Sequence, residues 1–267
     1  MATLRFTILG CGSSGGVPRL GDDWGDCDPK NPKNRRRRCS MLVERLAGDA
    51  ITRVLIDTSP DMREQLLDAH VSTLDGVVFT HSHADHTHGI DDLRQVVFNM
   101  KRRLPVWADA PTQNALISRF AYAFMQPDDS PYPPILDLRA IGGTFDVDGP
   151  AGPIQIQPFL VDHGSMDALG FRIGPLAYLP DVVGIPDAVW PVLEGLQCWV
   201  LDALRRKPHP THAHLALSLE WIARVKPAQA VITNMHLDLD YETLVRELPP
   251  TVSPAFDGRV ITFENQP

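Results

Sequence analysis

The sequence predicts an α/β protein in which two mixed sheets pack on each other with helices outside, an αββα four-layer sandwich. Two observations predict this layering. Short β-like runs alternate with helical stretches along the whole length, and the strands of the first half cluster without long crossovers while helices are spread throughout. The chain has 267 residues and no internal repeat or biased linker, so we expect one domain spanning residues 1–267.

Short apolar runs, bounded by turn residues, predict the strands in chain order. These runs are Leu4–Leu9, Met41–Arg45, Val54–Asp57, Val77–Thr80, Val106–Ala108, Ile154–Val161, Leu169–Ile173, Leu176–Leu179, Trp199–Leu201, Ala230–Thr233 and Val260–Phe263.

Apolar residues at helical spacing predict the helices that lie between these strands. Pro60, Pro111 and Pro186 stand where a first helical turn tolerates proline. The predicted helices are Asp61–His70, Asp91–Met100, Thr112–Met125, Asp187–Leu196, Leu215–Val225 and Tyr241–Leu248. Two long irregular segments, Gly10–Cys39 and Gln126–Arg139, are of the length that is usually functional or mobile.

The composition excludes several classes of protein. Acidic residues outnumber basic ones by 33 to 25, giving a formal net charge of −8, which disfavours a protein that coats nucleic acid. The four cysteines include no CxxC pair, so disulfides are not expected. The N-terminus lacks the pattern of a signal peptide, and no apolar run approaches the roughly 20 residues of a membrane span. We therefore expect a soluble cytoplasmic protein without membrane contact.

One segment carries most of the chemical information. An apolar strand runs directly into a His-x-His-x-Asp-His motif formed by His81, His83, Asp85 and His86. Three imidazoles and a carboxylate within six residues are typical ligands of divalent metals. On an extended loop His81 and His83 point to one side, and Asp85 and His86, one turn further on, can face a second ion. Two neighbouring ions are therefore plausible from local geometry alone.

A single loop cannot complete two coordination spheres, so further ligands are expected at strand ends downstream. His163, Asp181 and His236 each follow an apolar run directly. Each residue alone is more often a cap or a core residue, but together with the motif they complete two sites.

In this order, the motif and the three downstream residues resemble the metallo-β-lactamase fold superfamily. The resemblance covers nearly the whole chain, from the glycine-rich turn Gly10–Gly16 to the final strand. Its details are similar to the cyclic phosphodiesterase branch, whose known member opens phosphoribosyl 1,2-cyclic phosphate. The transfer-RNA 3′-processing endonucleases are near relatives.

The resemblance implies two divalent ions per chain, zinc or manganese, and a role for each ligand. His81, His83 and His163 would bind one ion, Asp85, His86 and His236 the other, and Asp181 would bridge the two.

Residues around the metals also receive implied roles. Asp57, at the end of its strand, would orient a ligand histidine, although a buried structural aspartate is an equal alternative. His214 would assist the scissile phosphate and the leaving group, as a catalytic residue beside Asp85 and Asp181. His212 is the neighbouring alternative for that role and a substrate-binding candidate, and His209 a weaker one.

The function implied is a dinuclear metal-dependent hydrolase that opens a small cyclic phosphate or a nucleotide-like phosphodiester. A thioester or lactam hydrolase of the same fold, a transfer-RNA processing nuclease and a non-catalytic metal-stabilised binding protein remain alternatives. The expected partner is a small phosphorylated substrate, a nucleotide or ribose phosphate. Dimers are common among the relatives, so a homodimer stays open.

Two segments are candidates for substrate contact. Among the four arginines Arg35–Arg38, Arg37 could clamp a phosphate, although a solvated face paired with upstream aspartates is the more ordinary explanation. Ser14, in the glycine-rich turn, could reach the site. The known phosphodiesterase carries a cysteine-rich zinc site in this stretch, whereas only Cys27 and Cys39 remain here, which puts a structural zinc in doubt.

Overall fold

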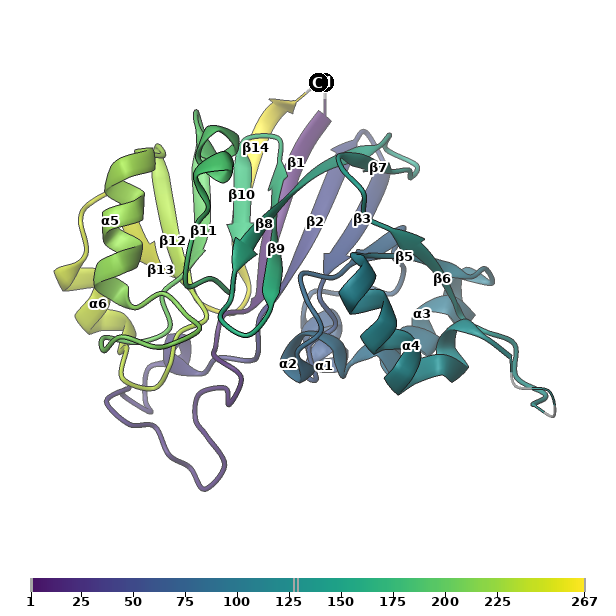
Figure 1. Cartoon of the computed structure of the whole chain (residues 1–267), viewed down its shortest axis with the longest axis horizontal. Helices are drawn as coiled ribbons and strands as arrows, with labels where there is room; N and C mark the ends of the chain where they lie inside the picture. Colours follow the sequence, from purple (N-terminus) through teal and green to yellow (C-terminus); the bar gives the residue numbers. More distant parts are fainter. Residues whose placement is uncertain (1, 127, 129, 267) are drawn as a thin grey trace. The chain divides into compact units, whose positions relative to one another are not determined.

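The computed structural model describes residues 2–126, 128 and 130–266, and it divides into two compact units. The first unit contains the chain up to Leu9, Ser40–Gln155 and the segment from Val260, and the second contains Gly10–Cys39 and Ile156–Arg259. The single domain expected for residues 1–267 thus contains two compact units, and its status as one domain stays a prediction. Figure 1 labels the elements of both units.

The first unit is built on a mixed sheet with the strand order β14-β1-β2-β3-β4-β5-β6. Strands β2 and β3 form an antiparallel hairpin, and β3, β4, β5 and β6 are parallel neighbours. The strands are β1 (Ala2–Gly10), β2 (Ser40–Ala47), β3 (Ala50–Ile56), β4 (Gly76–Val78), β5 (Leu104–Ala108), β6 (Leu136–Ala140) and β14 (Arg259–Gln266). The short strand β7 (Phe145–Val147) also belongs to this unit.

Parallel strands need crossovers, and the helices of the first unit supply them. They are α1 (Met62–Asp68), α2 (Ala84–Thr87), α3 (Leu93–Met100) and α4 (Ala110–Phe124), with a 3₁₀ turn at Ile90–Asp92. Helix α4 begins after Asp109, whose carboxylate accepts a hydrogen bond from the backbone N–H of Thr112 at 3.0 Å. Apolar side chains of the sheet and of α1, α3 and α4 form one buried core, which includes Leu55, Phe79, Val106 and Leu116.

The second unit is built on a sheet with the strand order β13-β12-β11-β10-β9-β8. Strands β8, β9 and β10 are antiparallel neighbours, whereas β10, β11, β12 and β13 are parallel. The strands are β8 (Ile154–Asp162), β9 (Asp167–Ile173), β10 (Leu176–Leu179), β11 (Cys198–Asp202), β12 (Gln229–Thr233) and β13 (Val252–Pro254).

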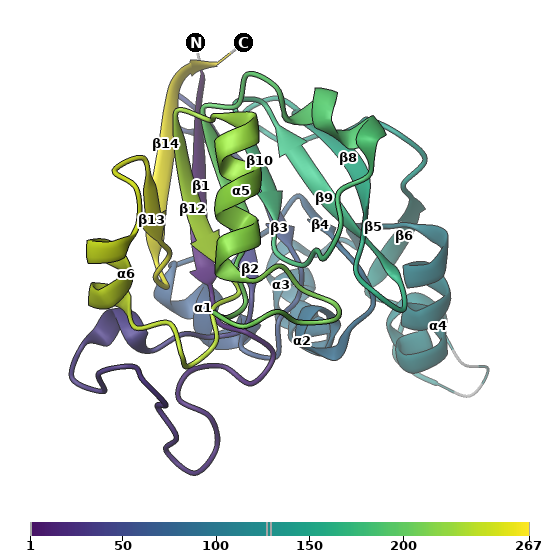
Figure 2. The same cartoon turned by 60° about the vertical axis from the view of Figure 1, so that its left-hand side comes forward.

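The helices of the second unit are α5 (Leu215–Val225) and α6 (Tyr241–Glu247). Helix α5 packs on β11 and α6 packs on β13. Figure 2 shows the two helices from another side. The predicted helix at Asp187–Leu196 is wrong in type and length, because the structure has a 3₁₀ helix at Asp187–Leu193. Pro191 lies inside it and lacks the N–H that an α-helix would use.

The prediction of two mixed sheets with helices is confirmed. The chemistry-bearing residues predicted at strand ends all follow strands: Asp57 follows β3, His81 follows β4, His163 follows β8, Asp181 follows β10 and His236 follows β12. None of the helices that the structure describes has the length and apolarity of a membrane crossing.

Candidate metal centre

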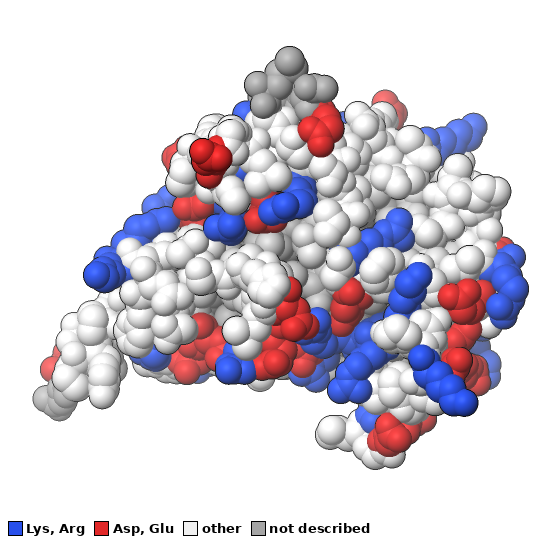
Figure 3. All heavy atoms as spheres, turned by 180° about the vertical axis from the view of Figure 1, so that it is seen from behind, with Lys and Arg blue, Asp and Glu red and all other residues white. Residues whose placement is uncertain are grey.

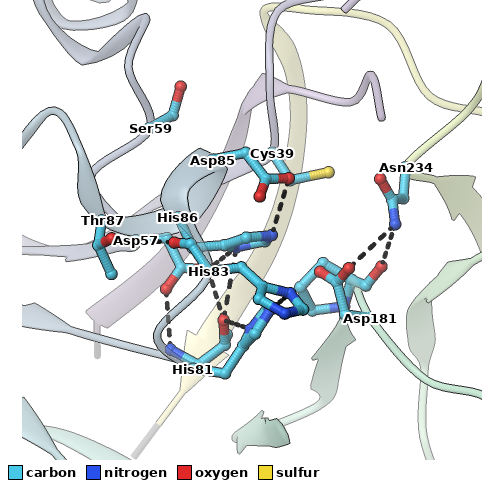
Figure 4. Close-up of polar contacts among 12 residues, drawn as sticks. Cys39, Asp57, Ser59, His81, His83, Asp85, His86, Thr87, Asp181 and Asn234 are labelled. Atoms are coloured by element: carbon cyan, nitrogen blue, oxygen red, sulfur yellow. Dashed lines mark hydrogen bonds and ion pairs between the residues drawn. The ribbon is translucent and has the colours of Figure 1, made fainter. Parts of the chain in front are cut away.

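In the first unit, Asp57 is the anchor of the histidine motif (Figure 4). Its carboxylate is fully buried and accepts hydrogen bonds from the Thr80 backbone N–H and hydroxyl, both at 2.8 Å, and from His86 Nδ1 at 2.7 Å. Asp57 itself has a left-handed backbone with φ of 64°. Strained backbone of this kind is kept where surrounding contacts fix it, commonly at functional sites.

These hydrogen bonds determine which ring nitrogens are protonated. A carboxylate only accepts, so His86 Nδ1 carries a proton, and in the neutral ring Nε2 is the nitrogen left to bind a metal. The Thr80 hydroxyl donates its hydrogen bond to Asp57. His81 Nδ1, which is 3.0 Å from the Thr80 hydroxyl oxygen, therefore donates to that oxygen. His81 Nε2 is then the unprotonated nitrogen as well. Both histidines thus hold the tautomer in which Nε2 can bind a metal.

His83 lies on the exposed side of the motif. Its Nδ1 is 3.0 Å from His81 Nε2, as drawn in Figure 4, and the ring centroids are 4.7 Å apart. Two nitrogens bound to one tetrahedral zinc at about 2.05 Å lie about 3.3 Å apart, so this separation suits two ligands of one ion. Asp85 places Oδ2 3.5 Å from His86 Nε2, with its side chain partly exposed.

The pKa of Asp57 is raised by its burial, although His86 and Thr80 donate to the carboxylate and oppose that shift. The negative charge is expensive at this depth, and its cost is met by three short hydrogen bonds. The two roles considered for Asp57, orienting a histidine and stabilising the structure, are therefore the same arrangement here, because Asp57 orients His86 and fixes the loop that carries His81.

In the second unit, His163 and Asp181 lie together with His212. One ligand atom from each of these three residues lies within 4.8 Å of the other two. His163 Nδ1 donates to the backbone carbonyl of Thr211 at 2.7 Å, which leaves Nε2 unprotonated and 4.0 Å from Asp181 Oδ1. Both side chains are buried. His163 and Asp181 thus place an imidazole and a carboxylate, ligand types that suit a divalent ion, next to the imidazole of His212.

Asp202, at the end of β11, is a site residue that the sequence reasoning missed. It is fully buried, and its Oδ2 accepts from His212 Nδ1 at 3.0 Å and from the Val182 backbone N–H at 3.2 Å. Burial raises the pKa of Asp202 to about 7, although the hydrogen bond from His212 opposes that shift. Asn234 Nδ2 lies 3.3 Å from carboxylate oxygens of both Asp181 and Asp202 (Figure 4 draws Asn234 with Asp181).

The remaining histidines are placed differently. His236 follows β12 and places Nδ1 3.1 Å from Asp238 Oδ1, outside the cluster of His163, Asp181 and His212. His214 is the N-terminal cap residue of α5, and its backbone carbonyl accepts from the Ser218 N–H at 3.0 Å. The geometry thus brings His212, rather than His214, next to Asp181; the catalytic role predicted for His214 stays a prediction.

The arginine run is not a uniform solvated face. Arg36 is 2% exposed, and its guanidinium donates to the carbonyls of His236 and Leu239 and to Asn34 Oδ1. For Arg36 the expectation of a solvated side chain is therefore wrong. The buried side chain needs close backbone packing: a Cβ added at Gly12 would lie 2.9 Å from Arg36.

Arg37, the predicted phosphate clamp, is held by Asp257. The Asp257 carboxylate accepts from the Arg37 backbone N–H at 2.8 Å and from Nε at 3.2 Å. Ser14 is exposed in the glycine-rich turn. Substrate contacts of both residues stay predictions. Cys27 and Cys39 are buried, reduced thiols, and Cys27 Sγ lies 3.8 Å from the Arg36 guanidinium.

A family profile described as "Beta-lactamase superfamily domain" matches residues 52–235. A curated relative, an octanoyltransferase of Porphyromonas gingivalis, is 32% identical over 260 residues, which are 96% of this chain. The chain spans 51% of that relative's length.

Solved structures agree with the family match. A structure described as a new diphosphatase from the PhnP family is 35% identical, covers 98% of both chains and has a TM-score of 0.88. YhfI from Bacillus subtilis (17% identity, 98% of this chain and 100% of that chain, TM-score 0.73) and the short form of human tRNase Z (14%, 96% and 98%, 0.65) share the fold. The chain therefore belongs to the metallo-β-lactamase superfamily, in a branch that resembles the PhnP family.

Proposed function

We propose that this hydrolase is a metal-dependent phosphodiesterase that acts on a small cyclic phosphate or a nucleotide-like phosphodiester. The observation that carries the proposal is the set of fixed tautomers: Asp57 and Thr80 hold His86 and His81 with unprotonated Nε2 atoms, and Thr211 does the same for His163. The relative described as a diphosphatase, which is 35% identical, supports phosphate chemistry.

The proposed ligands follow the predicted assignment. They are His81, His83, Asp85 and His86 in the first unit, and His163, Asp181 and His236 in the second. Imidazole and carboxylate without thiolate suit zinc and manganese. Bound divalent ions supply Lewis acidity, which makes water more acidic and offsets phosphate charge.

The protein's own contribution to proton transfer centres on His212. Hydrolysis of a diester expels a sugar oxygen, which needs a proton as the P–O bond breaks. His212 Nδ1 donates to the buried Asp202 at 3.0 Å and lies 3.4 Å from Asp181 Oδ1, so the imidazole is oriented. We therefore propose His212 in the role predicted for His214, with Nε2 giving the proton to the leaving oxygen.

The test is hydrolysis of bis(p-nitrophenyl) phosphate by the purified protein with manganese, with zinc and after chelation. The proposal expects turnover that depends on metal and disappears with the chelator. Absence of turnover in a protein that demonstrably binds two ions would contradict it. The matched variant His212→Gln keeps size and polarity but not acidity. It should lose turnover of a 2′,3′-cyclic nucleotide, whose sugar oxygen must be protonated as it leaves, while retaining its metal and its turnover of bis(p-nitrophenyl) phosphate, whose p-nitrophenolate leaves without a proton.

A second candidate is acyl-thioester hydrolysis, which the octanoyltransferase of Porphyromonas gingivalis favours because 96% of this chain matches about half of that protein. The same metal-loaded protein can be assayed with an octanoyl thioester, such as octanoyl-coenzyme A. Release of free thiol with no diester hydrolysis would select this candidate over the first.

A further inference from the structure

A hollow of about 480 Å³ lies on the first unit, apart from the histidine motif. Helix α3 supplies Arg94 and Phe98, α4 supplies Tyr122, and the connection from α4 to β6 supplies Ser130, Tyr132 and Pro133. Its volume is within the range of small-molecule sites in proteins, about 300–1,000 Å³. Three separate elements thus converge on a space of ligand size.

The hollow is lined by aromatic rings that the fold leaves in solvent. Phe98 is 59% exposed, Tyr122 42% and Tyr132 69%. Within the described part of the chain, none of these rings makes a ring–ring contact with another aromatic side chain. Aromatic side chains normally contribute to the core, so three exposed rings around one hollow indicate a binding surface.

The polar groups at this hollow are already held in place. Asp91 Oδ1 accepts from Arg94 Nη2 at 3.1 Å and Asp91 also accepts the hydroxyl of Tyr122. The Arg94 side chain is 32% exposed. Ser130 Oγ accepts from the Tyr132 backbone N–H at 3.2 Å and Gln126 donates to the Ser130 carbonyl at 2.7 Å. The contacts with Asp91 orient the Arg94 and Tyr122 side chains.

We propose that this hollow binds the nucleobase of a nucleotide substrate, a deepening that rests on the phosphodiesterase function proposed above. A base offers a flat π-face to the rings of Phe98, Tyr122 and Tyr132, and polar edge atoms to Arg94. An aliphatic chain would use the apolar rings but not the guanidinium, and a bare ribose phosphate would use the guanidinium but not the rings. The combination of three rings and one cation fits a base.

Helix α4 connects this hollow with the metal-binding motif of the same unit. The guanidinium of Arg119 donates to the Ser82 carbonyl, which lies between His81 and His83 in sequence. The Phe120 ring packs edge-on against His88 with a centroid distance of 5.5 Å. Tyr122 follows two residues later. A base that stacks on Tyr122 would thus contact helix α4, the same helix whose Arg119 contacts the histidine motif.

The experiment measures binding of adenosine 5′-monophosphate and ribose 5-phosphate to the metal-loaded protein by titration calorimetry. Stacking on aromatic side chains contributes about 1–3 kcal/mol per base, so the base should strengthen binding by about 5-fold or more. Tyr132→Ala and Phe98→Ala should each remove most of this difference, whereas Tyr132→Phe should retain it. Val245→Ala, at a side chain that is 50% exposed on α6, is the matched control and should leave both affinities unchanged.

Equal affinity of the two probes in the wild-type protein would overturn the proposal. Octanoate that binds to the wild-type protein and is lost in Tyr132→Ala, without a preference for the nucleotide, would assign the hollow to an acyl chain and also overturn it. The result is separable from the phosphodiesterase test, because the affinities of the two probes are measured without turnover. A protein that prefers the nucleotide and fails to hydrolyse a diester would leave this site standing and refute the function.

Discussion

Replacing Asp57 by Asn tests the hydrogen bonds that orient the metal-binding histidines. Asn preserves the size of the side chain and tolerates the left-handed φ of 64°, so the backbone should hold. The variant removes the charge from a fully buried 2.7 Å contact with His86 Nδ1. Hydrogen bonds to charged groups contribute roughly 1.5–3 kcal/mol to stability. Mutation of a residue that hydrogen-bonds to a metal-binding histidine usually weakens metal affinity by about 10- to 100-fold.

The assay is competition for zinc against a chromophoric chelator, on metal-free protein of each variant. We expect zinc to bind Asp57→Asn about 10- to 100-fold more weakly than the wild-type protein. Asp109→Asn is the matched control, because Asp109 caps α4 in the same unit and Asn is an equally good cap. An affinity of Asp57→Asn within twofold of the wild-type value, in a folded protein, would refute the reasoning.

Three further predictions concern the second unit. His212→Ala should lower turnover of a 2′,3′-cyclic nucleotide, which expels a sugar oxygen, by about 100-fold or more, while His214→Ala should change it by less than about threefold, which steady-state rates of the two variants decide. Burial raises the pKa of Asp257 to about 6 against the usual 3.8, so protonation stabilises the fold as pH falls. The free energy of unfolding of the wild-type protein should therefore fall by about 3 kcal/mol between pH 4 and pH 7, and that of Asp257→Asn should not. Urea denaturation at both pH values measures the difference, and an equal pH dependence in the two proteins would contradict the prediction. Arg36→Met should destabilise the protein by about 2–4 kcal/mol, because two carbonyls lose their donor, and an unchanged urea midpoint would exclude this role.

The motif could be predicted because its residues are adjacent in sequence. Strand β4 and the loop after it needed only the apolar run and the His-x-His-x-Asp-His spacing. His163, Asp181 and His236 could also be proposed, since each comes one to three residues after a strand with an apolar run. The ends of the strands determine where these three ligand-type residues lie, and the hydrophobic pattern of the sequence predicts the strands well.

Other features depend on tertiary contacts and were not predictable in this way. Asp202 gives the same signal as Asp181, a carboxylate at the end of an apolar strand, but only the structure shows it beside His212. Burial of Arg36 depends on carbonyls of residues 236 and 239, some 200 positions away. The 3₁₀ helix at Asp187–Leu193 shows the limit of periodicity where Pro191 interrupts it.

The charge balance agrees with a small substrate rather than a nucleic acid. On the face drawn in Figure 3, basic and acidic side chains are interspersed. A surface that grips a phosphate backbone would instead gather lysine and arginine into a stripe. The formal net charge of −8 points the same way.

The most direct measurement of the central claim is a titration of metal-free protein with zinc or manganese, following hydrolysis of bis(p-nitrophenyl) phosphate against ions bound per chain. The account predicts no turnover in metal-free protein and full turnover only when the second ion is bound, with loss of activity on chelation. Turnover that is independent of bound metal would contradict it.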